Sequence, residues 1–116
     1  MTTTLYLPYP VGTGNNSVRH GSRGHYLTAE AKACRDAVAD ILRGRRAPNG
    51  RVRTEWVINP PDLRARDFDN LSKVVNDALT HAGFWVDDSN KVIESGEWQW
   101  LEPVKGGLIE LHVRTV

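Results

Sequence analysis

The sequence predicts an α/β (α+β) fold, a single small domain in which two helices pack on a mixed β-sheet in the order β-α-β-α-β-β. Its 116 residues are enough for one domain with one modest core. Two segments place apolar residues at helical spacing, and four shorter segments have the composition or alternation of β-strands. Hydrophobic residues make up 40% of the chain and charged residues 25%, which is the usual balance of a globular protein.

The N-terminal third is expected to supply a strand over residues 3–7, a long loop and a helix. The loop, residues 8–26, is rich in Pro, Gly, Asn and Ser. A loop of this length either has a function, such as contact with phosphate groups, or is an ordinary surface loop. Its basic residues are Arg19, His20, Arg23 and His25.

Thr28 is expected to cap a helix that continues to about Arg43 and ends at Gly44. The buried stripe predicted for this helix comprises Ala31, Cys34, Val38, Ile41 and Leu42. Cys34 is the only cysteine, so it cannot form an internal disulfide. Its place in the stripe predicts a small buried apolar group and not a nucleophile.

Residues 51–58 alternate as a strand should, and Pro60 and Pro61 end that strand. A second helix is predicted from about Asp69 to Ala82, closed by Gly83. Its apolar stripe comprises Leu71, Val74, Val75, Ala78, Leu79 and Ala82. Residues 92–101 and 107–115 are predicted to form two strands of an antiparallel hairpin.

The net charge of +1 hides an uneven distribution. Residues 1–66 carry +6 and residues 67–116 carry −5. The first part resembles a polyanion-binding surface and the second a cation-binding one, unless solvated charges are divided unevenly by chance. With no apolar run of 18 residues and no pattern of a signal peptide, the protein is expected to be cytoplasmic and not to enter a membrane.

The most informative stretch is residues 60–89, which places two acidic pairs and a lysine around the second helix. Converging carboxylates repel one another unless a cation lies between them, and oxygen ligands suit Mg²⁺ or Mn²⁺. The sequence contains no Walker loop, nucleophile elbow, CxxC or HExxH motif, which leaves acid- or metal-assisted chemistry. The charged residues concerned are Asp67, Asp69, Lys73, Asp87 and Asp88.

Each part of this stretch also has a simpler interpretation. Asp69 could cap the helix while Asp67 is a loop residue, and Asp87–Asp88 could form a turn. Lys73 could form an ordinary i, i+4 ion pair with Asp69. An EF-hand starting at Asp67 fails, because its sixth and twelfth positions would be Ser72 and Ala78.

Distance is the main question, because a helix of 14 residues is about 21 Å long. The second acidic pair can meet the first only if the chain after Gly83 runs back along the helix. The segment Phe84–Val86 could do this as an extended apolar stretch, at about 3.3 Å per residue.

The stretch nevertheless resembles a known signature as a set. Its pattern is Pro61-Asp62-x-Arg64-x-Arg66-Asp67-x-Asp69-Asn70-x-x-Lys73, followed by Asp77-Ala78-Leu79, Gly83 and Asp87-Asp88-Ser89. This order and spacing over about 30 residues is similar to that of the RusA family of Holliday junction resolvases, which are often encoded by phages and prophages. The Pro/Asn-rich N-terminal loop followed by a helix resembles the family as well.

The resemblance implies a homodimeric, Mg²⁺-dependent endonuclease with a mixed α/β fold that places paired nicks across a four-way DNA junction. The catalytic aspartates of the family fall on Asp67, Asp69 and Asp88, with Asp87 as a further acidic member of the metal site. The essential lysine falls on Lys73, which is expected to contact the phosphate or orient the water. Mn²⁺ is a possible substitute for Mg²⁺.

Several cations are candidates for binding the phosphates of DNA, although each could equally be a solvated surface charge. The nucleic-acid-binding candidates are Arg19, Arg45, Arg46, Arg64, Arg66 and Lys73, and Arg43, Arg51 and Arg53 are further ones. Asn70 is expected either to hydrogen-bond within the site or to cap the helix. Trp98 and Trp100 share one face of a strand, where core or dimer packing is favoured over base stacking.

Two other functions stay open at this stage. A non-catalytic module that binds branched DNA is disfavoured because an acidic cluster without metal repels DNA. A metal-dependent hydrolase of small phosphorylated molecules is disfavoured by the dispersed arginines and by the lack of a phosphate-binding glycine loop.

Overall fold

The computed structural model describes residues 2–10, 18–21, 24–27 and 29–116, and for residues 18–21, 24–27 and 30 it describes the backbone alone. The first strand and first helix are β1 (Thr2–Leu7) and α1 (Ala29–Leu42). The rest of the main body consists of β4 (Val52–Asn59), α2 (Phe68–His81), β5 (Ile93–Trp100) and β6 (Leu108–Thr115). These elements confirm the predicted mixed sheet with two helices, each within two residues of its expected bounds.

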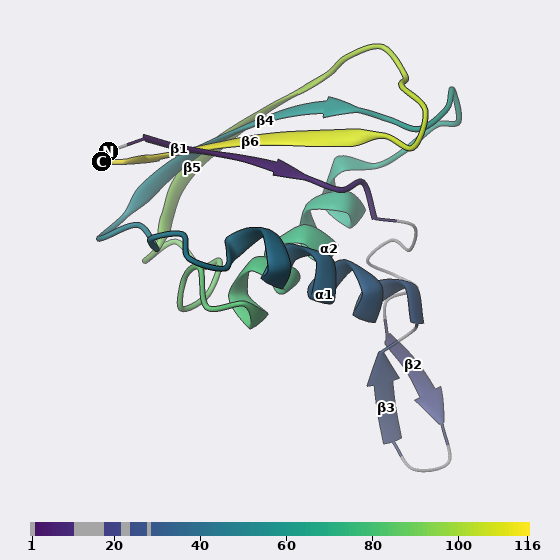
Figure 1. The fold of residues 1–116 in the computed structure, drawn as a ribbon, viewed down its shortest axis with the longest axis horizontal. Coiled ribbons are helices and arrows are strands. Elements are labelled where there is room, and N and C mark those ends of the chain that lie inside the picture. Colours follow the sequence, from purple (N-terminus) through teal and green to yellow (C-terminus); the bar gives the residue numbers. More distant parts are fainter. Residues whose placement is uncertain (1, 11–17, 22–23, 28) are drawn as a thin grey trace.

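A short hairpin is the element that the predicted order lacks. β2 (Val18–Gly21) and β3 (Gly24–Leu27) pair antiparallel as a separate two-stranded sheet within the segment expected to be a loop. Figure 1 shows this hairpin apart from the main sheet. Arg19 and His20 lie on β2 and His25 on β3, whereas Arg23 and Thr28 lie outside the described residues.

The main sheet has the order β1-β6-β4-β5, which makes the predicted hairpin of the last two strands wrong. β5 lies parallel to β4, and β6 pairs antiparallel with both β1 and β4. The link between β5 and β6 crosses the end of β4, where Leu101 N–H donates to the carbonyl of Ile58 and Val104 N–H to that of Pro60. β6 is therefore inserted on the far side of β4, where Ile109, Leu111 and Val113 are buried.

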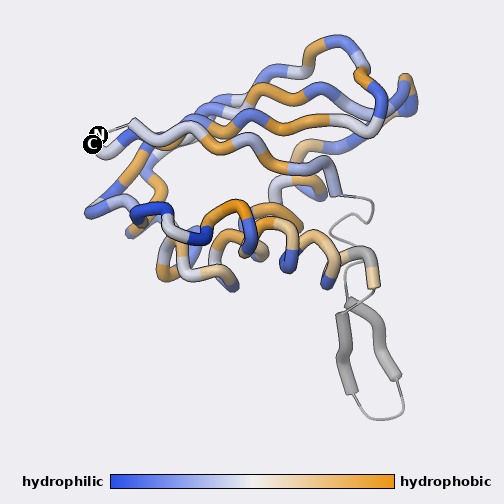
Figure 2. Tube along the Cα trace, in the orientation of Figure 1, coloured by the Kyte–Doolittle hydropathy of each residue, from blue (hydrophilic) through white to orange (hydrophobic). Residues whose placement is uncertain are grey.

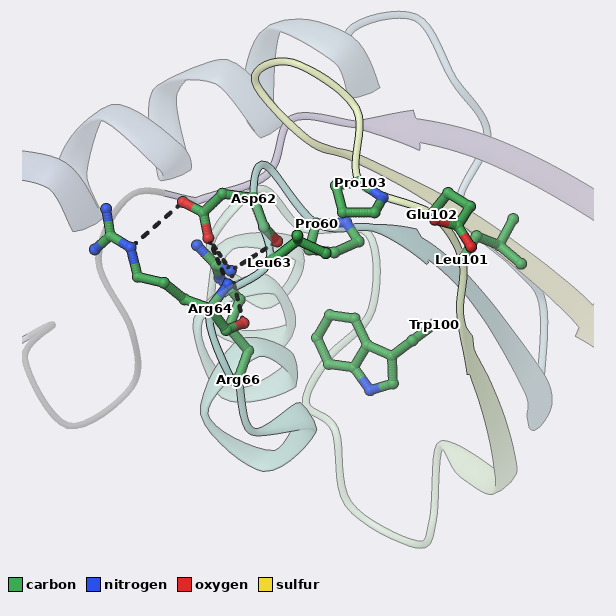
Figure 3. Close-up of a pocket in the computed structure, with 9 residues that line it drawn as sticks. All are labelled: Pro60, Asp62, Leu63, Arg64, Arg66, Trp100, Leu101, Glu102 and Pro103. Carbon is green, nitrogen blue, oxygen red and sulfur yellow. Dashed lines mark hydrogen bonds and ion pairs between the residues drawn. The ribbon is translucent and has the colours of Figure 1, made fainter.

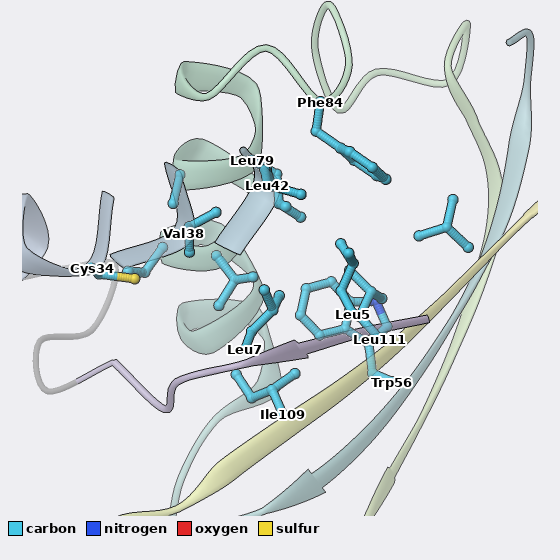
Figure 4. Close-up of a cluster of buried hydrophobic side chains, with 14 of the residues drawn as sticks. Leu5, Leu7, Cys34, Val38, Leu42, Trp56, Leu79, Phe84, Ile109 and Leu111 are labelled. Carbon is cyan, nitrogen blue, oxygen red and sulfur yellow. The ribbon is translucent and has the colours of Figure 1, made fainter. Parts of the chain in front are cut away.

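Both helices cover the same face of this sheet, and the core lies between the two layers (Figures 1 and 4). Hydrophobic residues follow both helices and alternate along the strands (Figure 2). The predicted inward face of β4 is confirmed, and Cys34 is buried in the core, which raises the pKa of its thiol. Fully buried core residues include Leu5, Leu7, Val38, Ile58, Val75, Leu79, Ile109 and Leu111.

α2 is the crossover of a parallel β4-α2-β5 unit, and this topology positions the acidic residues. Parallel strands start at the same end of a sheet, so α2 must carry the chain from the end of β4 back to the start of β5. The first acidic pair therefore lies at the carboxyl end of β4, and the second lies near the start of that strand. Among the described residues, no helix has the length and apolar character needed to cross a membrane.

Candidate active site

The first acidic pair lies at the N-terminus of α2. Asp67 is the N-cap: its backbone is extended, and its Oδ1 accepts a hydrogen bond of 2.9 Å from the N–H of Asp69. The interpretation of Asp69 as the cap is therefore wrong, and so is the cap role considered for Asn70. Asp69 is exposed in the first helical turn, where the positive end of the helix favours carboxylates. The capping bond leaves Asp67 Oδ2 available to a ligand.

A network around Arg66 holds the loop that leads into α2 (Figure 3). The guanidinium of Arg66 donates to the carboxylate of Asp62 at 2.7 Å and to the carbonyls of Asp62 and Arg64 at 3.3 and 3.0 Å. It also lies 5.6 Å from the centre of the Tyr9 ring, within the range of a cation–π contact. The hydrogen bond from Arg66 is the main reason why the pKa of Asp62 falls to about 2. Because Arg66 Nη1 binds two carbonyls of the loop as well as Asp62, it fixes the backbone immediately before Asp67.

Phe68, between the two aspartates, is held by aromatic rings from two strands. Its ring stacks on Trp98 of β5, with centroids 4.4 Å apart and planes 4° apart. It meets Trp56 of β4 edge to face, at 5.3 Å and 85°. Trp56 and Trp98 are register partners on neighbouring strands, and Trp56 is 3% exposed. The first helical residue of α2 is thus fixed to the sheet on two sides.

The second acidic pair lies in the turn between α2 and β5. Gly83 leaves α2 with a φ of +80°, a conformation that favours glycine, and the chain then buries Phe84 and Trp85 to 3% and 6% exposure. Asp87 Oδ1 accepts the backbone N–H of Ser89 at 2.8 Å. Hydrogen bonds from the side chain and the backbone of Ser89 lower the pKa of Asp87. The two buried aromatic residues anchor the turn from its N-terminal side.

The end of this turn is tied to the start of β4. The Nε–H of Arg51 donates to the carbonyl of Asn90 at 2.9 Å, and the N–H of Val52 donates to that of Val92 at 2.8 Å. Arg51 and Arg53 form ion pairs with Glu94 at 3.6 and 2.9 Å. These two arginines, considered above for phosphate contact, thus have carboxylate partners within the chain.

A narrow cleft of about 170 Å³ separates α2 from β5. Phe68, Ser72 and Asn76 line it at i, i+4 and i+8, so they form one ridge of the helix. Asp88 lines the same cleft, which answers the question of distance in part: the chain after Gly83 does bring Asp88 back onto the flank of α2. The Oδ1 of Asn76 is a buried acceptor with no hydrogen-bond donor among the described residues.

Asp77 is an acidic residue near this cleft that the predicted site did not include. Its pKa is raised, first by partial burial and then by the charge of Asp88, while Lys73 and Arg35 act in the opposite direction. Asp88 therefore lies close enough to Asp77 to repel it. Asp77 follows Asp69 by eight residues, or about 12 Å along the helix. The second acidic pair has returned along α2, but it does not reach the first.

Comparison with known proteins decides the family. The family model described as Endodeoxyribonuclease RusA matches residues 8–105. The chain is 39% identical to the crossover junction endodeoxyribonuclease rusA of Enterobacteria phage 82, across 94% of this chain and 91% of the relative. The chain belongs to the RusA family. Proteins named crossover junction endodeoxyribonuclease RusA from Escherichia coli K12 and Shigella sonnei Ss046 are 38% and 37% identical, each across 97% of this chain and 93% of the relative.

The predicted metal ligands lie in two pairs, one at the N-terminus of α2 and one in the turn after it. The predicted ligands are hard carboxylate oxygens and exposed, which suits Mg²⁺. Among the described residues, however, no group of three or more His, Cys, Asp or Glu side chains is placed to hold an ion. The roles of Asp67, Asp69, Asp87 and Asp88 as ligands stay predictions.

Lys73, the predicted catalytic lysine, is exposed on α2 one turn after Asp69. The simple alternative of an i, i+4 ion pair is not formed, since no ion pair of Lys73 occurs within the described residues. Its ammonium group is therefore available to an incoming anion.

The other cationic candidates differ in their exposure and in whether their side chains already have partners. Arg46 is exposed, and Arg45 is exposed with one long hydrogen bond of 3.4 Å to the carbonyl of Thr4. Arg64 is 85% exposed and lies 3.5 Å from Asp62. Arg66 is 19% exposed and already paired, so binding a phosphate would compete with the Asp62 bond. The side chain of Arg19 lies outside what the structure describes.

Proposed function

We propose that this chain is a structure-specific endodeoxyribonuclease that resolves four-way DNA junctions by paired symmetric nicks in the service of DNA recombination and repair. The observation that carries the proposal is the match over nearly the whole chain to proteins named crossover junction endodeoxyribonucleases. The residues that give the family signature its chemistry all lie on α2 and its two flanks. Fold alone would not support this assignment, since one fold serves many functions.

The proposed reaction is hydrolysis of a phosphodiester bond with Mg²⁺ as cofactor and Mn²⁺ as a possible substitute. A bound divalent ion would activate the attacking water and neutralise charge on the phosphate. Asp67, Asp69 and Asp88 are proposed to hold it, with Asp87 in support. Lys73 is proposed to bind the phosphate oxygen, because it is exposed one helical turn after Asp69 and forms no ion pair with a carboxylate within the described residues.

A homodimer is the proposed working form. Two strands related by symmetry must be cut, and a two-fold dimer presents two equivalent sites to them. A chain of 116 residues is also small compared with a four-way junction. Cytoplasmic residence is proposed from the single, buried cysteine.

The proposal is tested by incubating the purified protein with a labelled synthetic four-way junction in Mg²⁺, in Mn²⁺ and in EDTA. We expect paired nicks with either metal and none in EDTA, while linear duplex and free nucleotides are left uncut. Binding of the junction without cleavage in either metal would favour the non-catalytic module. Hydrolysis of nucleotides in preference to the junction would favour the small-molecule hydrolase.

Metal binding needs a readout that does not depend on activity. Isothermal titration of the DNA-free protein with Mg²⁺ or Mn²⁺ should show binding that weakens in an Asp69→Asn variant. Equal binding by the variant and the wild type would remove Asp69 from the metal site.

A further inference from the structure

We propose that Trp98 is a positioning residue for the first acidic pair, acting through Phe68 without touching the substrate. The proposal rests on the proposed function, because it concerns the same carboxylates. It assigns a role to an edge-strand residue about thirty positions away from the pair that it controls.

The contacts define a clamp of three rings. Trp56 belongs to the core, at 3% exposure, and touches the Phe68 ring edge to face. Trp98 covers the Phe68 ring in a near-parallel stack at 4.4 Å. Edge-to-face and stacked arrangements are the two favoured geometries of aromatic pairs. The Phe68 side chain therefore packs against the buried ring of Trp56 and is covered from β5 by the ring of Trp98.

Fixing Phe68 fixes the aspartates on either side of it. Consecutive Cα atoms are 3.8 Å apart, so Asp67 and Asp69 can move little while Phe68 is held. The hydrogen bond from Asp69 N–H to Asp67 Oδ1 spans Phe68, so it depends on the backbone geometry of that residue. A shift of about 1 Å in a catalytic group can lower a rate by as much as ~10²-fold, so this restraint bears on chemistry.

Trp98 is well suited to this role and poorly suited to being an ordinary core residue. It is 53% exposed, and β5 is an edge strand. Its neighbours on the same face are Trp100, which packs against the core, and Gly96, where a Cβ would lie 2.7 Å from Thr54 Oγ1. Trp98 is therefore the β5 residue that covers Phe68, and its removal would release Phe68 while leaving the buried core intact.

The test compares Trp98→Ala with two matched variants. Trp98→Phe keeps a planar ring that can stack on Phe68. Gln99→Ala changes the next residue on β5, which is exposed and points to the opposite face of the sheet. Each protein is measured for single-turnover cleavage of the junction at saturating enzyme, for the Mg²⁺ concentration at half-maximal rate, and for junction affinity.

We expect Trp98→Ala to lower the cleavage rate about 10-fold and to raise the half-maximal Mg²⁺ concentration several-fold, as for other groups that orient metal ligands. Junction affinity and the dissociation constant of the proposed dimer should stay within about 2-fold of wild type. Trp98→Phe should recover most of the rate, and Gln99→Ala should match wild type. An unchanged rate and Mg²⁺ dependence would overturn the proposal. So would a loss of junction affinity equal to the loss of rate, which indicates a stacked base, or a loss of the dimer, which indicates a subunit contact.

A second readout is independent of cleavage. The amide signal of Asp69 in ¹H–¹⁵N NMR spectra should show faster hydrogen exchange in Trp98→Ala than in Gln99→Ala, because its bond to Asp67 is loosened. If the wild type fails to cut junctions but this amide behaves as expected, the proposed function fails and the clamp stands. If the amide is unchanged, the clamp fails whatever the enzyme does. Trp98→Leu, which keeps apolar bulk without stacking, replaces Trp98→Ala if that variant does not fold.

Discussion

The two acidic pairs of this protein are fixed in different ways. Asp67 and Asp69 flank Phe68, which packs against aromatic rings of β4 and β5, and Arg66 holds the loop before them. Asp87 and Asp88 lie in a turn whose hydrogen bonds are mostly local, with two buried aromatic residues as its anchor. The first pair thus depends on aromatic contacts with two strands and on the Arg66 network, and the second depends on its own turn, on the core beneath it and on hydrogen bonds with the start of β4.

The difference shows which contacts hold each half of the candidate site. The first pair is tied to two strands of the sheet through Phe68, so it forms a fixed half of the candidate site. The second pair lies beside α2 close to Asp77, and its turn is held by the buried Phe84 and Trp85 and by hydrogen bonds with the start of β4. Because no group of three or more metal-ligating side chains is formed among the described residues, assembly of a complete site is expected to bring the two pairs together.

The largest expected effect comes from removing one carboxylate of the fixed half. Asp67→Asn should lower junction cleavage by more than ~10²-fold, because even residues that merely orient metal ligands contribute 10–100-fold. Junction affinity, measured by gel shift, should change little, because asparagine can still accept the capping bond. Asp36→Asn, on the exposed face of α1, is the matched control and should cut normally. Wild-type cleavage by Asp67→Asn would remove Asp67 from the mechanism.

Phe84, which anchors the turn of the second pair, should contribute strongly to the stability of the folded protein. Phe84→Ala deletes a ring that is 3% exposed and should lower the free energy of unfolding by about 3–5 kcal/mol. Phe84→Leu, which keeps most of the buried volume, should cost clearly less. Urea unfolding followed by tryptophan fluorescence gives both values. Equal stability of Phe84→Ala and wild type would show that the turn is not anchored by the core.

Arg66 gives a pH-dependent test of the fixed half. The pKa of Asp62 is about 2, below its ordinary value of 3.8, so this carboxylate stabilises the folded state above pH 3.8 and the contribution is lost as pH falls through 2. Arg66→Gln should return the pKa of Asp62 toward 3.8, because the hydrogen bond from Arg66 is the main cause of the shift. Carboxyl ¹³C NMR titration measures it, and an unchanged pKa would contradict the network in Figure 3.

The smallest expected effect concerns Asp77 beside the second pair. Burial and the charge of Asp88 raise the pKa of Asp77, so its ionised form is disfavoured in the folded protein. Asp77→Asn should therefore raise the Tm slightly at pH 7, and the gain should shrink as the pH falls and Asp77 is protonated in the wild type. Differential scanning calorimetry at several pH values measures it. A gain that grows at low pH would contradict the assignment.

The sequence predicted much of this architecture because the signals were local. The apolar stripes of both helices and the alternation of β4 correspond to buried residues in the structure. The pairing of β5 and β6 was mispredicted because proximity along the chain favours a hairpin, whereas burial of Ile109, Leu111 and Val113 favours a central position for β6. The β2–β3 hairpin was missed because glycines at its turn and the surrounding polar residues are equally typical of a loop.

The site was predictable as a motif but not as a set of contacts. The spacing of aspartates and Lys73 indicated the family, whereas the partnership of Phe68 with Trp98 depends on strand register that no local pattern contains. Asp62 and Arg66 stand four residues apart, and that spacing could have suggested their ion pair. Asp77 belongs to the family-like signature in the sequence, but its nearness to Asp88 depends on how the chain returns after α2, which no local pattern contains.

The central claim is that the two acidic pairs act as one catalytic centre. Single-turnover cleavage of a labelled four-way junction in Mg²⁺ should be measured for wild type, Asp67→Asn, Asp88→Asn and the double variant. Residues that act as a unit are strongly non-additive, so each single variant should fall to the same residual rate, and the double variant should be no slower. Wild-type cleavage by Asp88→Asn, or a double variant whose loss is the product of two separate losses, would contradict the claim.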